Sequence, residues 1–144
     1  MSVSHILKHK GRDVITASPE ATVKQVAEML SAKRIGAVII SSGNDKIDGI
    51  VSERDIVRAI GLEGAAALEK PVSSVMTKDV RSCGDEDTET ELMALMTRHR
   101  IRHLPVVNQG KLSGMISIGD VVKFRIEQIE RDAADMKAYI SGGS

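Results

Sequence analysis

The sequence predicts an α/β (α+β) protein built from two tandem copies of one β-α-β-β-α unit, packed sheet to sheet around a pseudo-twofold axis. The main observation is an internal repeat with an almost constant offset. Asp13-Val14 returns as Asp79-Val80, 66 positions later, and Gly49–Asp55 returns as Gly114–Asp120, 65 positions later. Similarity that keeps its spacing across a whole unit is the signature of tandem structural repeats.

Two further observations support this fold. The offset changes by one residue in the turn-rich stretch Ser42–Lys46, where an insertion costs little. Each copy is also short, and a unit of roughly 60 residues with few large side chains is only marginally stable alone. We therefore expect the two sheets to pack against each other.

Each element of the first copy has its own local signal. A strand begins at Val14-Ile15 and ends before Pro19, because proline lacks the amide hydrogen that a strand interior needs. A helix follows, with apolar residues at i, i+3, i+4 and i+7. Two apolar runs around a turn then predict a hairpin, and a second helix starts at about Glu53. The helix face consists of Val23, Val26, Ala27 and Leu30, and the hairpin of Ile35–Ile40, the turn Gly43–Asp45, and Ile47–Val51.

The second copy follows the same order. Its first helix carries a shorter apolar stripe, and its hairpin again consists of two apolar runs around a turn. The stripe is Leu92, Leu95 and Met96, the hairpin is His103–Val107, Asn108–Gly110 and Leu112–Ile116, and the last helix starts at about Ile118. The chain is thus divided into a first repeat at 1–66, a second repeat at 67–127 and a C-terminal helical tail at 128–144.

The tail carries an apolar pattern of its own. Five apolar residues alternate spacings of three and four, which is typical of the a/d seam of a coiled coil. They are Ile126, Ile129, Ala133, Met136 and Ile140. The seam either forms a contact between two copies, which predicts a homodimer, or packs on the protein's own repeats.

Composition limits the classes of function. Twenty basic residues balance twenty acidic ones, which argues against a nucleic-acid partner. Phe124 and Tyr139 are the only aromatic residues, too few for stacking on bases. The single cysteine, Cys83, allows no internal disulfide, and the acids that follow it should disfavour its thiolate. Without a signal-peptide pattern or an apolar run of about 20 residues, we expect a cytoplasmic protein and no membrane partner.

The repeated block Gly-x-apolar-Ser-x-x-Asp lies at a strand-to-helix junction and has two interpretations. In the first, Ser52 and Ser117 cap their helices, and Asp55 and Asp120 bond back to the cap amides, which requires no ligand. In the second, the helix start offers free amides and a positive dipole to an anion, and the carboxylate accepts hydrogen bonds from ribose hydroxyls.

Together with His103–Val107, these two blocks resemble those of a tandem pair of CBS domains, the arrangement called a Bateman module. The resemblance covers about residues 5 to 127, nearly the whole chain. It implies an adenosine ligand between the repeats: AMP, ADP, ATP, NAD(H) or S-adenosylmethionine.

The resemblance also implies a role for each matching position. Carboxylates hold ribose hydroxyls, serines touch ribose or phosphate, basic residues or glycine border phosphate, and small residues border adenine. The carboxylates are Asp55 and Asp120, the serines Ser52 and Ser117, the residues near phosphate Arg54, Gly119, Arg102 and His103, and those near adenine Ile35, Gly36 and Ala37.

The first copy departs from this pattern. It has no basic pair to match Arg102-His103, and Glu53 places an acid beside the expected phosphate region. Arg54 compensates only if its guanidinium faces the phosphate rather than solvent. With Arg102 and His103 assigned to the cleft of Asp120, we expect that cleft to bind a mononucleotide first.

These residues predict a regulatory module rather than an enzyme. The sequence contains no recognisable P-loop and no set of residues that would form a nucleophile and its base. The pairs His5 and His9, and His99 and His103, lack the further ligands at suitable spacing that a metal site needs. With no catalytic domain expected beside the repeats, the output would be an unknown downstream protein partner or a change in assembly. The alternative is a structural dimerisation module that binds no ligand.

Overall fold

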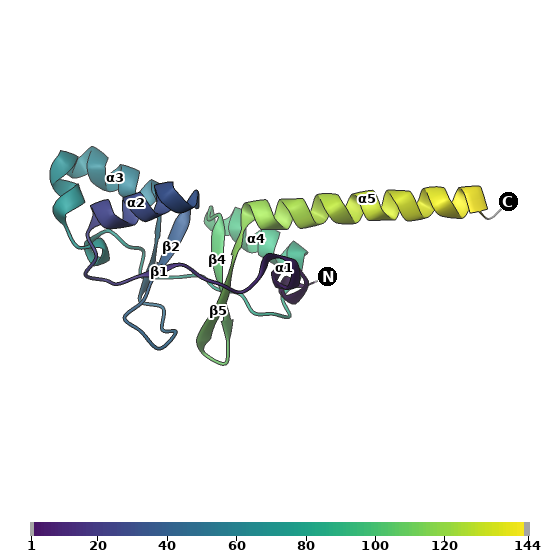
Figure 1. The fold of residues 1–144 in the computed structure, drawn as a ribbon, viewed down its shortest axis with the longest axis horizontal. Helices are drawn as coiled ribbons and strands as arrows, with labels where there is room; N and C mark the ends of the chain where they lie inside the picture. Colours follow the sequence, from purple (N-terminus) through teal and green to yellow (C-terminus); the bar gives the residue numbers. More distant parts are fainter. Residues whose placement is uncertain (1, 143–144) are drawn as a thin grey trace.

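The computed structural model describes residues 2–142 and contains both repeats (Figure 1). Met1, Gly143 and Ser144, at the ends of the first and third predicted segments, lie outside it. The first repeat consists of β1 (Thr16–Ala17), α2 (Val23–Lys33), β2 (Ala37–Ile40), β3 (Gly49–Ser52) and α3 (Glu53–Glu63). The second consists of α4 (Glu89–His99), β4 (His103–Asn108), β5 (Lys111–Ser117) and α5 (Ile118–Gly142). The predicted order of helices and hairpins is confirmed.

The two sheets share one topology. In the first, β2 pairs in parallel with β1 and antiparallel with β3. In the second, β4 and β5 form the antiparallel hairpin, and the first strand is reduced to a parallel bridge between Cys83 and Val106. This bridge corresponds by the repeat offset to the β1–β2 pairing of Ala17 with Ile40. The sheets lie side by side, and the amide of Leu112 donates to the carbonyl of Asp45 at 3.0 Å across the two hairpins (Figure 1).

The helices that open the two repeats start and end alike. The hydroxyls of Thr22 and Thr88 accept hydrogen bonds from the amides of Gln25 and Glu91, at 3.1 and 3.2 Å. Such caps satisfy amides that the first helical turn leaves free. Both helices end at an arginine in the left-handed conformation, Arg34 and Arg100, each with a φ of 54°.

Three short helices were not predicted from the sequence. They are α1 (Val3–Lys10) and the 3-10 helices η1 (Gly64–Glu69) and η2 (Val72–Ser74). A helix of eight residues is too short to be stable by itself. In α1, Val3, Ile6 and Leu7 lie on one face and are buried, so packing stabilises a helix that propensity alone would not.

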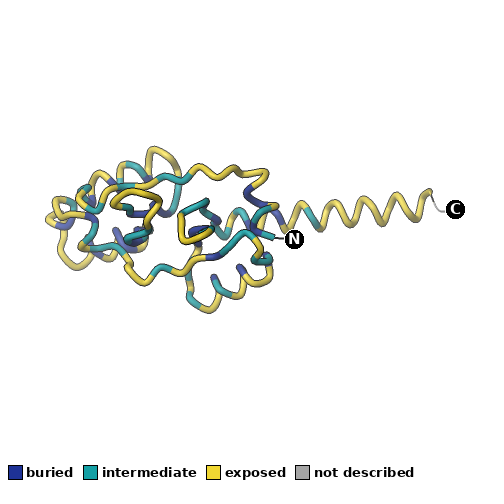
Figure 2. Tube along the Cα trace, turned by 90° about the horizontal axis from the view of Figure 1, so that it is seen from below, coloured by how far each residue is buried: buried dark blue, intermediate teal, exposed yellow. Residues whose placement is uncertain are grey.

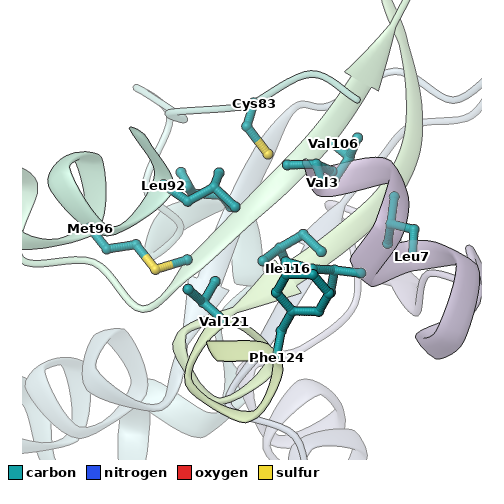
Figure 3. Packing of buried hydrophobic residues seen from close by; sticks show 11 residues of the cluster. Val3, Leu7, Cys83, Leu92, Met96, Val106, Ile116, Val121 and Phe124 are labelled. Carbon is teal, nitrogen blue, oxygen red and sulfur yellow. The ribbon is translucent and has the colours of Figure 1, made fainter. Parts of the chain in front are cut away.

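The apolar side chains form two separate cores, and each core includes a segment that precedes the other repeat. The second core combines β4, β5, α4 and α5 with Val3, Ile6 and Leu7 of α1 (Figure 3). The first core includes Val72 of η2 and the partly buried Val75. Thr77 also pairs with Ile50 beside β3. The sequence division between residues 66 and 67 therefore does not coincide with the boundary between the cores.

Helix α5 extends beyond the body of the protein (Figure 1). Val121 and Phe124 are buried against the second core. From residue 125 to 142 nearly every residue is exposed (Figure 2). Between residues 2 and 142, no helix is long and apolar enough to cross a membrane.

Cys83 should be inert to thiol reagents in the folded protein. Burial, together with the charges of Asp87 and Asp85, raises the pKa of the thiol to about 12. Because the thiolate is the reactive form, we expect labelling by a disulfide reagent at pH 8 only after unfolding in denaturant. Rapid stoichiometric labelling of the native protein would contradict this.

Candidate functional site

The two Ser-x-x-Asp blocks adopt the geometry of helix caps. At the start of α3, the Ser52 amide donates to Asp55 Oδ2 at 2.9 Å, and the Asp55 amide donates to Ser52 Oγ at 3.4 Å. At the start of α5, the same bonds join Ser117 and Asp120 at 2.8 and 3.1 Å. The capping interpretation is therefore correct for both blocks, and any ligand contact by these carboxylates is additional to it.

A second pair of equivalent bonds holds each helix start against the neighbouring hairpin strand. The amide of Glu53 donates to the carbonyl of Gly36 at 3.0 Å, and the amide of Ile118 donates to that of Arg102 at 2.8 Å. A Cβ on Gly36 would lie 2.9 Å from the His103 ring, so a larger residue there would require the ring to shift. The residues before β2 and β4 thus come together with both helix starts.

A cavity of about 640 Å³ opens at the Asp55 helix start and is lined by both repeats. This volume is within the ordinary range for small-molecule sites. Seven of the eleven residues expected at a site line it: Gly36, Ala37, Ser52, Arg54, Asp55, Arg102 and His103. The other four, Ile35, Ser117, Gly119 and Asp120, are not part of this lining.

The structure corrects the expected grouping of the basic residues. Arg102 and His103 were assigned to the cleft of Asp120, but they line the cavity of Asp55. The reason is that the residues before β4 reach across to the helix start of the first repeat, where Gly36 and Ala37 of that repeat also lie. The cavity of Asp55 therefore has the pair Arg102 and His103, for which its own repeat has no match.

Arginines of both repeats, including Arg81 in the segment before α4, surround the cavity. Its lining includes Arg54, Arg58, Arg81, Arg100 and Arg102, against the acids Glu53, Asp55 and Asp79. Two of the arginines face acids of the lining, Arg58 near Asp55 at 3.7 Å and Arg81 near Asp79 at 3.6 Å. Within residues 2–142, the guanidiniums of Arg54, Arg100 and Arg102 have no carboxylate partner, and Arg54 Nη1 donates to the Arg100 carbonyl at 3.3 Å.

His103 serves this cavity as a neutral group. Burial is the main reason that its pKa is lowered, and the charge of Lys10 lowers it further, against the opposing effects of Asp120 and Glu53. A neutral imidazole both donates and accepts hydrogen bonds. The positive charge at the cavity therefore comes from guanidiniums.

The lining residues that were not expected at the site include Arg58, Thr77, Arg81 and Arg100. Thr77 Oγ1 donates to Asp55 Oδ1 at 3.4 Å. It belongs to the chain between the repeats, and only the pairing of Thr77 with Ile50 brings it to the site. The proximity of Arg100 to Arg102 in the sequence was a usable signal, because both precede β4.

Asp120 has a different partner. Lys10 at the end of α1 donates from Nζ to Asp120 Oδ2 at 2.5 Å and to the Met115 carbonyl at 2.8 Å. Burial raises the pKa of Asp120, but the bond from Lys10 and the bonds from Ser117 outweigh this and hold the pKa below its usual value. Its carboxylate is thus neutralised within the chain.

The CBS domain family matches residues 3–62 and 72–127. The chain belongs to the CBS domain family. The two matches make it a tandem CBS pair, as the paired hairpins and helix starts indicate. The family match includes α1 in the first repeat, which the sequence pattern alone did not reveal.

Two solved structures and one curated relative are similar to this chain. The CBS-domain containing protein ATU1752 from Agrobacterium tumefaciens is 45% identical over 87% of this CBS pair and 99% of that chain, with a TM-score of 0.85. The CBS domain protein PAE2072 from Pyrobaculum aerophilum, complexed with AMP, is 30% identical over 83% and 89%, with a TM-score of 0.73. The mitochondrial protein CBSX3 of Arabidopsis thaliana is 29% identical over 99% of this pair and 73% of its own length.

Proposed function

We propose that this CBS pair is a regulatory module that binds an adenosine nucleotide in the cavity of Asp55. The observation that carries the proposal is that one cavity brings together a helix-start carboxylate and three guanidiniums that no carboxylate of residues 2–142 pairs. A carboxylate suits ribose hydroxyls, and guanidiniums suit phosphate. The AMP complex of the relative from Pyrobaculum aerophilum supports the same ligand class.

The charge of the cavity ranks the candidate ligands. AMP, ADP, ATP and NAD(H) all carry phosphates that the guanidiniums of Arg54, Arg100 and Arg102 can bind. S-adenosylmethionine carries a positive sulfonium instead, which these arginines disfavour. We therefore place the phosphorylated nucleotides first and S-adenosylmethionine last.

The arginines and Asp55 of the lining are suited to binding. Arginine is not deprotonated in proteins and cannot act as a base, and Asp55 is held by Ser52, Thr77 and Arg58. The signal would pass through conformation or assembly to a second copy or a downstream protein. The cytoplasmic location expected from the sequence remains a prediction.

Asp55→Ala should weaken AMP binding by about tenfold or more. A hydrogen bond to a charged group is worth about 1.5–3 kcal/mol, and 1.4 kcal/mol corresponds to tenfold in affinity. Isothermal titration calorimetry with AMP, ATP, NADH and S-adenosylmethionine measures this. Asp120→Ala is the matched control, because it removes the same helix-cap bond at the other block and should leave AMP affinity unchanged.

A larger loss in Asp120→Ala than in Asp55→Ala would show that the clefts are ranked wrongly. Failure of all four ligands to bind the wild-type protein would favour the alternative of a ligand-free dimerisation module. Thermal unfolding gives an independent reading, since a ligand at 100 times its Kd adds about 2.7 kcal/mol to stability.

A further inference from the structure

The outer part of α5 is a long helix that lacks tertiary support in the single chain. Val121 and Phe124 are buried against the second core, but the helix runs on to Gly142 with nearly every residue exposed (Figure 2). Most helical stability in proteins comes from tertiary packing rather than from the propensity of the residues. We therefore expect residues 125–142 of α5 to pack against a partner.

The exposed apolar residues of this segment form one stripe. Val122, Ile126 and Ile129 are 45%, 49% and 53% exposed, and Met136 and Ile140 are 62% and 68% exposed. With Ala133 they occupy successive d and a positions of the heptad. At 100° per residue, this seam lies about a third of a turn around the helix from Val121 and Phe124. The protein's own body therefore leaves the seam open.

The charges that flank the seam indicate which partner covers it. Arg125 and Asp132 fall at g positions, and Glu130 and Lys137 at e positions. In a parallel pair of identical helices, each g residue faces the e residue five positions on in the other helix. This places Arg125 opposite Glu130 of the second copy and Asp132 opposite Lys137 of the second copy. Each of these two pairs occurs twice in the dimer, and all four contacts join opposite charges.

Antiparallel pairing is less favourable. Full overlap of the seam places Glu130 opposite Glu130 and Asp132 opposite Asp132 of the second copy. Offsets that pair opposite charges bring only four of the six seam residues of each helix into contact. Arg125 already bonds Glu89 at 3.1 Å within the chain, but a guanidinium has five N–H donors and can serve both carboxylates.

We propose that α5 pairs with α5 of a second copy as a parallel, in-register coiled coil over residues 122–140. The inference is independent of the nucleotide site. It places the bodies of both copies at the same end of the coil.

Sedimentation equilibrium of the full chain tests whether the seam of α5 is a contact between two copies. We expect a dimer at micromolar concentration and a monomer for Ile129→Asp, because that change puts a charge into the seam. Ala134→Asp introduces the same charge on the outer face of the same helix and should remain dimeric. A monomeric wild-type protein, or a dimer that survives Ile129→Asp, would overturn the proposal.

Oxidation of an Ile140→Cys variant tests the orientation, since Cys83 is buried. Identical seam positions face each other only in the parallel pair, so a disulfide-linked dimer is expected on a non-reducing gel. An Ile140→Cys dimer that does not cross-link would show that the helices are not parallel.

Discussion

Replacing Lys10 with methionine is expected to open a second nucleotide site at Asp120. In the wild-type chain, Lys10 Nζ donates to Asp120 Oδ2 and to the Met115 carbonyl. A ribose hydroxyl must displace this charge-assisted bond, at a cost of about 1.5–3 kcal/mol. Methionine keeps most of the apolar stem and removes the charge. Calorimetric titration with AMP should then give a stoichiometry of two AMP per chain instead of one. The affinity for AMP at Asp120 should increase tenfold or more over that of the wild-type chain.

Lys8→Met is the control for this experiment, because it removes the same charge from the same helix. It should leave the stoichiometry at one. The pKa of Asp120, followed by NMR, should rise in Lys10→Met and not in Lys8→Met, because Lys10 helps to hold this pKa low. An unchanged stoichiometry in Lys10→Met would mean that this lysine does not exclude the nucleotide.

Leu7→Ala should destabilise the protein by about 2–5 kcal/mol, the usual range for removing a buried leucine side chain. Leu7 is only 2% exposed and packs in the second core, although it precedes the first repeat (Figure 3). Its Cδ1 lies 3.0 Å from the point where a Cβ on Gly114 would stand. Loss of this side chain therefore leaves a cavity between α1 and β5. Urea denaturation followed by circular dichroism measures the effect.

Leu62→Ala is the comparison for Leu7→Ala, because the same atoms are removed from a leucine that is 80% exposed. Its stability should change by less than about 0.5 kcal/mol. Similar losses in the two variants would contradict the packing of α1 in the second core.

The tandem fold and its hairpins were predictable because they depend on local patterns. The stripe at Val23, Val26 and Leu30 and the Ser-x-x-Asp blocks each lie within one short segment, and their positions in the structure agree with the sequence pattern. The start of α3 was also predictable from a local signal, because the helix begins directly after the Ser52 cap.

The composition of the site was only partly predictable, because it depends on contacts between repeats. The sequence alone assigns Arg102 to the repeat of Asp120, whereas the fold places it across the interface beside Asp55. Lys10 and Thr77 reach the two carboxylates from segments that precede each repeat. Neither segment has an apolar pattern long enough to predict where it packs.

We expect the exchange of preceding segments to make the two repeats unfold together. Leu7 completes the core of the second repeat and Val72 that of the first, so neither half retains its interior when the other opens. Chains of this size with such mutual dependence usually unfold in one all-or-none transition. A ligand held at Asp55 alone therefore stabilises the second repeat and α1 as much as the first, and its binding free energy is shared by the whole molecule.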